Sequence, residues 1–248
     1  MSNNDKKKRN RDLLSPEDAR KTIGNNLTFA AAEAYRLLRT NLEFSLPAEK
    51  KCKIVGVTSA LRGEGKSTTS VNIAYTMAQN NGKVLLIEAD LRLPTLAKRL
   101  NVNSRPGLSN LLVGKCRGND IIQRSGLISN LWVVTAGDIP PNPAELLGSE
   151  NMKQTIDALS DLFDVIIIDL PPVTAVTDAL IISKIVDGMV VISRQGYCTK
   201  GAVDEVVRQL RFVNAKILGF VMTGADTHKK GYKRYGYYGD YKQRSKEH

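Results

Sequence analysis

Apolar residues occur in short, nearly continuous runs that alternate with longer stretches at helical spacing. A strand covered on both faces has such a run, because neither face has to be polar. The predicted strands are Ile54–Thr58, Val84–Ile87, Leu131–Thr135, Val165–Ile168, Met189–Ser193 and Ile217–Met222. The predicted helices are Phe29–Phe44, Ser67–Gln79, Glu150–Leu162, Asp178–Ile185 and Thr199–Phe212.

This alternation of strands and helices predicts the fold class, a doubly wound, mostly parallel α/β sheet. After Gly224 the periodicity ends and the chain is rich in Gly, Lys and Tyr, which is typical of a mobile tail. We therefore expect a basic N-terminal segment over residues 1–25, one domain over 26–227 and a tyrosine-rich tail over 228–248.

One predicted strand leads into a loop with the properties of a phosphate-binding site. Residues 59–68 read Ser-Ala-Leu-Arg-Gly-Glu-Gly-Lys-Ser-Thr, with Ala60 where the general motif has its first glycine. Glycines let the backbone wrap an oxyanion with its N–H groups, and the following helix adds its dipole. A lysine there can reach the terminal phosphates, and the next hydroxyl can ligate Mg²⁺. The predicted nucleotide-binding residues are Gly63, Glu64, Gly65, Lys66, Ser67 and Thr68.

Acidic residues follow two other predicted strands. Glu88 and Asp90 come after one strand, and Asp169 comes after another. In a parallel sheet, ligands bind outside the carboxyl ends of the strands, and residues two apart on a strand point the same way. We therefore expect all three carboxylates near the phosphate loop, where Mg²⁺ needs one or two carboxylates and a nucleophilic hydroxyl needs a base. Taken singly, each acid could equally be a strand-end cap or an ion-pair partner.

Composition and charge narrow the range of partners. The net charge is +11, but residues 1–11 carry +4 and residues 229–248 carry +5, which leaves +2 for the body. Such a body lacks the basic face of a dedicated DNA reader, whereas basic ends suit an anionic surface. No apolar run approaches the ~20 residues of a membrane span, and no hydrophobic stretch follows the basic N-terminus. The three separated cysteines are typical of a reducing cytoplasm.

Five features, taken together, resemble one protein family. Residues 58–68 match its relaxed Walker A motif, residues 85–92 its Walker A′ motif with Glu88 in place of the usual first Asp, and residues 166–172 its Walker B motif. Residues 33–39 match a Glu-x-x-Arg-x-x-Arg motif, and five tyrosines cluster near the C-terminus. The chain resembles the bacterial tyrosine kinases (BY-kinases) of capsule and exopolysaccharide assembly. It is most similar to the Gram-positive form, in which the cytoplasmic kinase is separate from its membrane activator.

The resemblance implies a P-loop fold related to MinD and ParA and an ATP- and Mg²⁺-dependent protein-tyrosine autokinase. In that reading Lys66 holds the β- and γ-phosphates, and Ser67, Asp90 and Asp169 place the metal. Glu88 or Asp90 takes the proton from the tyrosine hydroxyl. Because Glu88 carries its carboxylate one methylene further out than Asp, the two residues stay alternatives for the base.

The resemblance also implies what the kinase acts on and with. The expected phosphorylation sites are Tyr232, Tyr235, Tyr237, Tyr238 and Tyr241. A ring-like homo-oligomer is expected to form through Glu33, Arg36 and Arg39, with phosphorylation in trans. The expected partners are a membrane-spanning activator or polysaccharide co-polymerase, a cognate tyrosine phosphatase and other protein substrates, with no specific nucleic acid. The kinase is expected in the cytoplasm, recruited to the inner face of the membrane.

Two alternative functions stay open. A MinD- or ParA-like ATPase switch shares the fold, but it needs a signature lysine where this chain has Leu61, and it gives the tyrosine cluster no role. The other alternative is a non-catalytic, ATP-binding regulator of polysaccharide chain length. The replacement of the usual first Asp by Glu88 is compatible with it.

Overall fold

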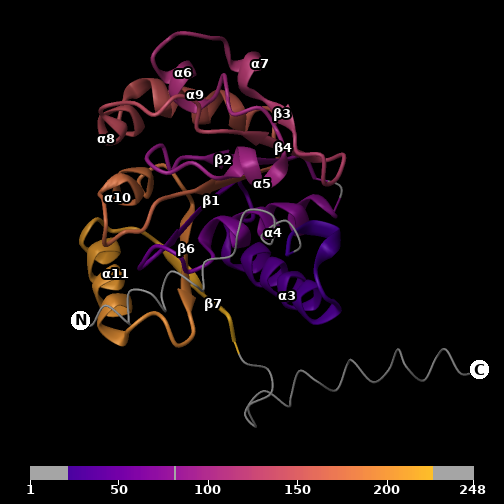
Figure 1. Ribbon diagram of the computed structural model, residues 1–248, viewed down its shortest axis with the longest axis vertical. Coiled ribbons are helices and arrows are strands. Elements are labelled where there is room, and N and C mark those ends of the chain that lie inside the picture. The colour runs from indigo at the N-terminus through magenta and orange to yellow at the C-terminus, as the bar shows by residue number, and fades with distance from the viewer. Residues whose placement is uncertain (1–21, 81, 226–248) are drawn as a thin grey trace, which may run out of the picture.

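The computed structural model describes residues 22–80 and 82–225, and it is built around a seven-stranded sheet. The strand order is β3-β4-β2-β5-β1-β6-β7, and every pair is parallel except β3 with β4 (Figure 1). The strands are β1 (Lys53–Ser59), β2 (Val84–Glu88), β3 (Gln123–Arg124), β4 (Leu131–Val134), β5 (Val165–Asp169), β6 (Gly188–Arg194) and β7 (Ile217–Thr223). The doubly wound α/β fold is confirmed.

Helices cover both faces of this sheet. They are η1 (Gly24–Asn26), α3 (Phe29–Ser45), α4 (Lys66–Ala78), α5 (Leu96–Leu100), α6 (Leu108–Leu112), α7 (Gly118–Ile121), α8 (Pro143–Leu147), α9 (Glu150–Ser160), α10 (Asp178–Ile182) and α11 (Lys200–Phe212). Helices α3, α4 and α5 share a buried cluster with Val84 and Leu86 of β2. Helices α9, α10 and α11 share the opposite cluster with Leu85 and Ile87. Alternate residues of one strand thus enter two cores, which explains the continuous apolar runs.

The carboxyl ends of the central strands meet at one edge. Asp169 at the end of β5 lies opposite Glu88 of β2 on one side and Val57 of β1 on the other. Two residues after Val57, β1 ends at Ser59 and the chain enters the phosphate loop. The topology therefore places the loop beside the strand-end acids, as a doubly wound sheet requires.

The helices and strands of the structure differ from the predicted ones both in number and in extent. The short helices α5 to α8 and the two-residue strand β3 were not predicted, and α9 and α10 end before the predicted residues. Ile23 and Gly24, in the expected N-terminal segment, are buried, and the N–H of Gly24 donates to Asn72 Oδ1 of α4 at 3.0 Å. The body of the domain therefore includes these residues. The tyrosine-rich tail from residue 228 lies outside the described residues.

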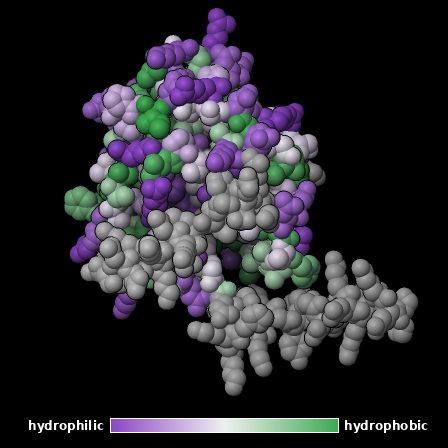
Figure 2. Space-filling view, in the orientation of Figure 1, coloured by the Kyte–Doolittle hydropathy of each residue, from purple (hydrophilic) through white to green (hydrophobic). Residues whose placement is uncertain are grey.

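Hydrophobic and hydrophilic side chains are intermingled over the face seen in Figure 2. Across residues 22–80 and 82–225, no helix combines the length and apolar character that crossing a membrane requires.

Candidate functional site

The phosphate loop joins β1 to α4, and a buried glutamate holds its shape. The Glu64 carboxylate accepts the backbone N–H of Leu61 at 2.6 Å and that of Arg194 at 3.3 Å. The Glu64 carbonyl accepts the Thr223 hydroxyl at 2.6 Å. Gly65 caps α4 with a φ of +87°, a left-handed conformation that glycine adopts without strain. These bonds tie the loop to the ends of β6 and β7.

The ammonium group of Lys66 lies between two carboxylates. Its Nζ is 3.1 Å from Asp169 Oδ1, 3.5 Å from Asp90 Oδ2 and 3.3 Å from Ser67 Oγ. One turn later in α4, the Ser70 hydroxyl donates to Asp169 Oδ1 at 3.0 Å. The structure thus brings together a cation, two carboxylates and two hydroxyls at the start of one helix. Sequence analysis named all of these residues except Ser70.

The two aspartates have oxygen atoms suited to a divalent cation. Asp169 Oδ2 is buried and has no hydrogen-bond partner within the part of the chain that the structure describes. A buried carboxylate oxygen normally has a partner, and a cation or a cation-bound water supplies one. Burial raises the pKa of Asp90, Lys66 opposes that rise, and the charge of Asp169 adds to it.

The donor set fits Mg²⁺ that arrives with a nucleotide. Among the described residues, no group of three or more His, Cys, Asp or Glu side chains could hold a metal ion alone. Mg²⁺ in nucleotide sites is typically held by one or two carboxylates together with phosphate oxygens and water. Asp90, Asp169 and the Ser67 hydroxyl would provide the protein's share of such a site.

Glu88 lies at the same edge, but its carboxylate binds backbone groups. It is 1% exposed and accepts the N–H groups of Thr95, of Leu96 at 2.7 Å and of Ala136 at 3.2 Å. Burial is the main cause that raises the pKa of Glu88 to about 7, and these hydrogen bonds oppose the rise. Of the three strand-end acids, Asp90 and Asp169 thus reach the Lys66 ammonium, and Glu88 fixes the start of α5.

Two cavities adjoin the phosphate loop. One, of about 280 Å³, contains Lys66, Ser67 and Asp90, and the other, of about 350 Å³, contains Thr68, Thr69 and Asn72. Gly63, Gly65 and Arg99 line both. A nucleotide lying across the loop could therefore place its terminal phosphates in the first cavity and its nucleoside in the second.

Two arginines after β2 shape the site. Arg92 makes a bidentate ion pair with Asp178, with Nε–Oδ2 and Nη2–Oδ1 distances of 2.9 and 3.0 Å. The Arg99 guanidinium donates to the Thr68 hydroxyl of α4 at 3.1 Å. Sequence analysis noted Arg92 only as part of a motif and missed Arg99, because no spacing pattern connects Arg99 with the loop.

The predicted interface residues on α3 have different surroundings. Glu33 and Arg36 form an ion pair with each other, and each is 46% exposed. The Arg39 side chain is 18% exposed, and its Nη1 donates to the Thr76 carbonyl of α4 at 3.0 Å. Glu33 and Arg36 are therefore available to a partner, whereas Arg39 mainly joins α3 to α4. The five candidate phosphorylation sites lie outside the described residues.

Comparison with known proteins gives close relatives over most of the chain. The AAA domain family profile matches residues 52–218. The tyrosine-protein kinase YwqD of Bacillus subtilis (strain 168) is 40% identical over 208 residues, which cover 84% of this chain and 86% of that protein. The solved kinase domain of the Escherichia coli tyrosine kinase ETK superposes with a TM-score of 0.77 at 33% identity, covering 85% of this chain and 83% of that one.

A more distant structure shares the fold. The Pyrococcus furiosus cell division ATPase MinD has a TM-score of 0.58 at 24% identity, covering 68% of this chain and 71% of that one. This likeness shows a common P-loop architecture and carries no information on activity.

Proposed function

The chain belongs to the bacterial tyrosine-protein kinases that include YwqD, and from this premise we propose that it is an ATP- and Mg²⁺-dependent autokinase that phosphorylates its own tyrosine-rich tail. The observation that carries the proposal is the Lys66 ammonium held between Asp90 and Asp169 at the start of α4. That arrangement combines a phosphate-binding cation with carboxylates for a metal and a base at one point.

Phosphoryl transfer depends chiefly on positioning and charge neutralisation. Lys66 would exchange its carboxylate contacts for the β- and γ-phosphates when ATP binds. The backbone of Gly63, Glu64 and Gly65 and the hydroxyl of Thr68 would cradle the remaining phosphate oxygens. Mg²⁺, when bound, would neutralise phosphate charge, held by Ser67, Asp90 and Asp169 directly or through water.

Asp90 is the better placed of the two candidate bases. Its carboxylate lines the loop cavity, whereas the carboxylate of Glu88 is engaged by three backbone N–H groups. A base must reach the hydroxyl whose proton it takes. We therefore expect Glu88→Gln to retain phosphotransfer. Asp90→Asn should lose phosphotransfer while ATP still binds, and because Asp90 is also a proposed Mg²⁺ ligand, a role as base requires that the loss persists at saturating Mg²⁺. Loss in Glu88→Gln, with wild-type nucleotide affinity and folding, would return the role to Glu88.

The direct test of the proposed function is phosphotyrosine formation in purified protein given ATP and Mg²⁺. Lys66→Met should lower labelling by orders of magnitude, because it removes the charge that stabilises the transferring phosphoryl group. Lys153→Met, at an exposed position of α9, is the matched control and should label as wild type does. Wild-type labelling in Lys66→Met would overturn the site assignment.

The cellular role follows from the family resemblance. We propose that the kinase works as a homo-oligomer in capsule or exopolysaccharide synthesis and export, with a membrane-spanning activator that recruits it to the membrane and a phosphatase that reverses labelling. The basic N-terminus and tail would add attraction to anionic lipid. Labelling with and without a membrane fraction tests the activator, and no stimulation by any membrane component would contradict it.

The labelling assay also separates the alternatives. An ATPase switch would hydrolyse ATP without forming phosphotyrosine, and a non-catalytic regulator would bind ATP without either reaction. The greater likeness to the ETK kinase domain than to MinD, together with Leu61 in place of the signature lysine, supports the kinase.

A further inference from the structure

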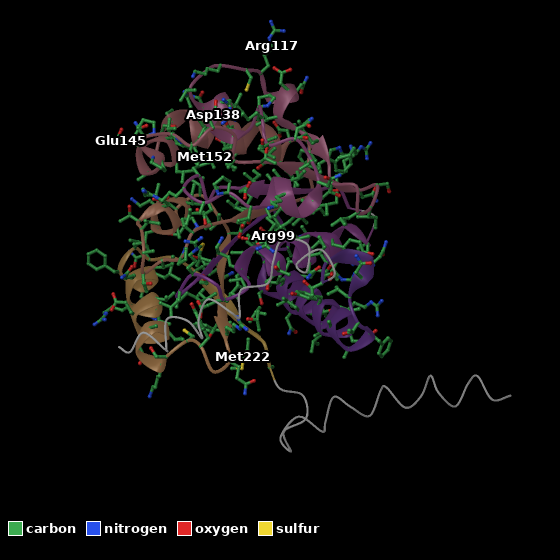
Figure 3. The ribbon with its side chains drawn as sticks, viewed as in Figure 1. Arg99, Arg117, Asp138, Glu145, Met152 and Met222 are labelled. Carbon is green, nitrogen blue, oxygen red and sulfur yellow. The ribbon has the colours of Figure 1, made fainter. Side chains whose placement is uncertain are left out.

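Arg99 lies where the two loop cavities meet. It lines both of them, together with Gly63 and Gly65. Figure 3 shows it between α5, which carries it, and α4. Its Nη1 donates to Thr68 Oγ1 at 3.1 Å, so the guanidinium is held beside the first turn of α4, where the phosphate loop ends.

The position of Arg99 is fixed by the short helix α5. Leu96 and Leu100 of α5 are buried in the cluster that also contains α4. The Glu88 carboxylate accepts the N–H groups of Thr95 and Leu96, which anchors the start of the helix. Arg99 Nε donates to Thr95 Oγ1 at 3.2 Å, which orients the side chain along α5. A guanidinium held in this way loses little conformational freedom when it binds a ligand.

The guanidinium has unused capacity for an anion. It has five N–H donors, and its two hydrogen bonds are to neutral hydroxyls. Within residues 22–80 and 82–225, no carboxylate forms a salt bridge with it. A forked donor set without a paired carboxylate, at the rim of a phosphate loop, is suited to a phosphate oxygen.

We propose that Arg99 binds the nucleotide phosphate nearest the ribose and so sets affinity for ATP and ADP alike. The order of residues along the loop identifies that phosphate. Lys66, between Asp90 and Asp169, marks the terminal-phosphate end, and Thr68 lines the other cavity, where the nucleoside would lie. Arg99, which contacts Thr68, therefore meets the middle of the bound molecule. This assignment rests on the proposed nucleotide-binding function of the same site.

Calorimetric titration of the full chain with ATP and with ADP tests the assignment. Loss of one charge-assisted phosphate contact should weaken both nucleotides about 10-fold in Arg99→Ala, while Arg99→Lys should recover part of the loss. Lys66→Met should instead weaken ATP more than ADP. Arg208→Ala, at a 75% exposed arginine on α11, is the matched control and should bind as wild type does.

The outcomes separate this inference from the function on which it rests. Arg99→Ala affinity within twofold of wild type, or a loss confined to ATP, would overturn the role of Arg99. If the alanine variant unfolds, Arg99→Gln takes its place, because glutamine can still donate to Thr68 but lacks the positive charge. The same loss of affinity for both nucleotides is then expected. A wild-type chain that binds no nucleotide would overturn both proposals, whereas one that binds nucleotide but forms no phosphotyrosine would overturn the kinase and leave the Arg99 test valid.

Discussion

At the scale of single residues, the buried carboxylates of Glu88 and Asp169 differ in their hydrogen-bond partners. Glu88 receives three backbone N–H groups, whereas Asp169 uses one oxygen for Lys66 and Ser70 and leaves the other without a partner among the described residues. A buried carboxylate whose two oxygens both accept hydrogen bonds stabilises the fold, whereas one with an unpartnered oxygen can bind a ligand. From this contrast we expect Glu88 to have a structural role and Asp169 to bind the metal.

Glu88 should make stability depend on pH in a defined direction. Its pKa is raised from 4.5 to about 7, so as pH rises through this interval the unfolded chain releases a proton that the native chain keeps. The free energy of unfolding should therefore fall from pH 5 to pH 7 and level off above it, a component of roughly 3 kcal/mol at most. Glu88→Gln should remove this component, and denaturant unfolding from pH 5 to pH 8 measures it.

The control for this measurement is Glu145→Gln, which changes an exposed side chain on α8 and should keep the wild-type profile. A stability difference between wild type and Glu88→Gln that grows in favour of wild type as pH rises would contradict the prediction.

At the scale of elements, the ion pair of Arg92 and Asp178 joins the segment after β2 to α10. Asp178 is fully buried and the Arg92 side chain is 38% exposed, so removing the arginine leaves a buried carboxylate without its main partner. We expect Arg92→Ala to lower the free energy of unfolding by about 2 kcal/mol. Because Arg92 is partly exposed, solvent weakens the pair, and we expect this loss of unfolding free energy to be smaller than for a fully buried ion pair.

A double-mutant cycle checks the pair. Asp178→Asn removes the charge but keeps the size, so Arg92→Ala with Asp178→Asn should cost clearly less than the sum of the single changes, with a coupling of about 1 kcal/mol. Additive losses in urea unfolding would show that the two residues act independently.

The elements also show how far the sequence could predict the site. The buried strands and long helices were predicted because two covered faces and helical periodicity leave a clear pattern. The five-residue helix α5 is too short for periodicity, so Arg99 could not be placed at the loop. Strand periodicity correctly put Glu88 and Asp90 at one edge, but the acceptance of N–H groups from Thr95 and Ala136 depends on tertiary packing.

At the scale of the whole molecule, α3 presents the side chains for the proposed oligomer. On the same helix as the ion pair of Glu33 and Arg36, Phe44 is 87% exposed and Leu37 is 45% exposed. Arg36→Glu should reduce association in sedimentation with little change in stability, because it reverses a half-exposed charge at the proposed interface. The association should also weaken with salt.

Helix α11 offers a matched control for that experiment. Arg208 pairs with Glu205 at the same three-residue spacing as Arg36 with Glu33, and Arg208→Glu should leave the oligomer intact. A wild-type chain that stays monomeric at low and high salt with an unphosphorylated tail would contradict the oligomer. Equal loss of association in both variants would indicate a general charge effect.

The tail and the active site should work between neighbouring subunits. Residues 229–248 carry a net charge of +5 and include five of the eight tyrosines, so we expect an unmodified tail to be attracted to the aspartates of a neighbour's active site. Each phosphorylation adds about −1.5 to −2 charges, so two or three events neutralise the tail and five reverse its charge. We expect phosphorylation in trans to weaken association and release monomers.

Mixing Lys66→Met with an active, tail-deleted chain tests the transfer, because the inactive chain then carries the tail tyrosines. Label should appear on the inactive chain, and its absence, with an assembled and ATP-binding partner, would refute transfer in trans.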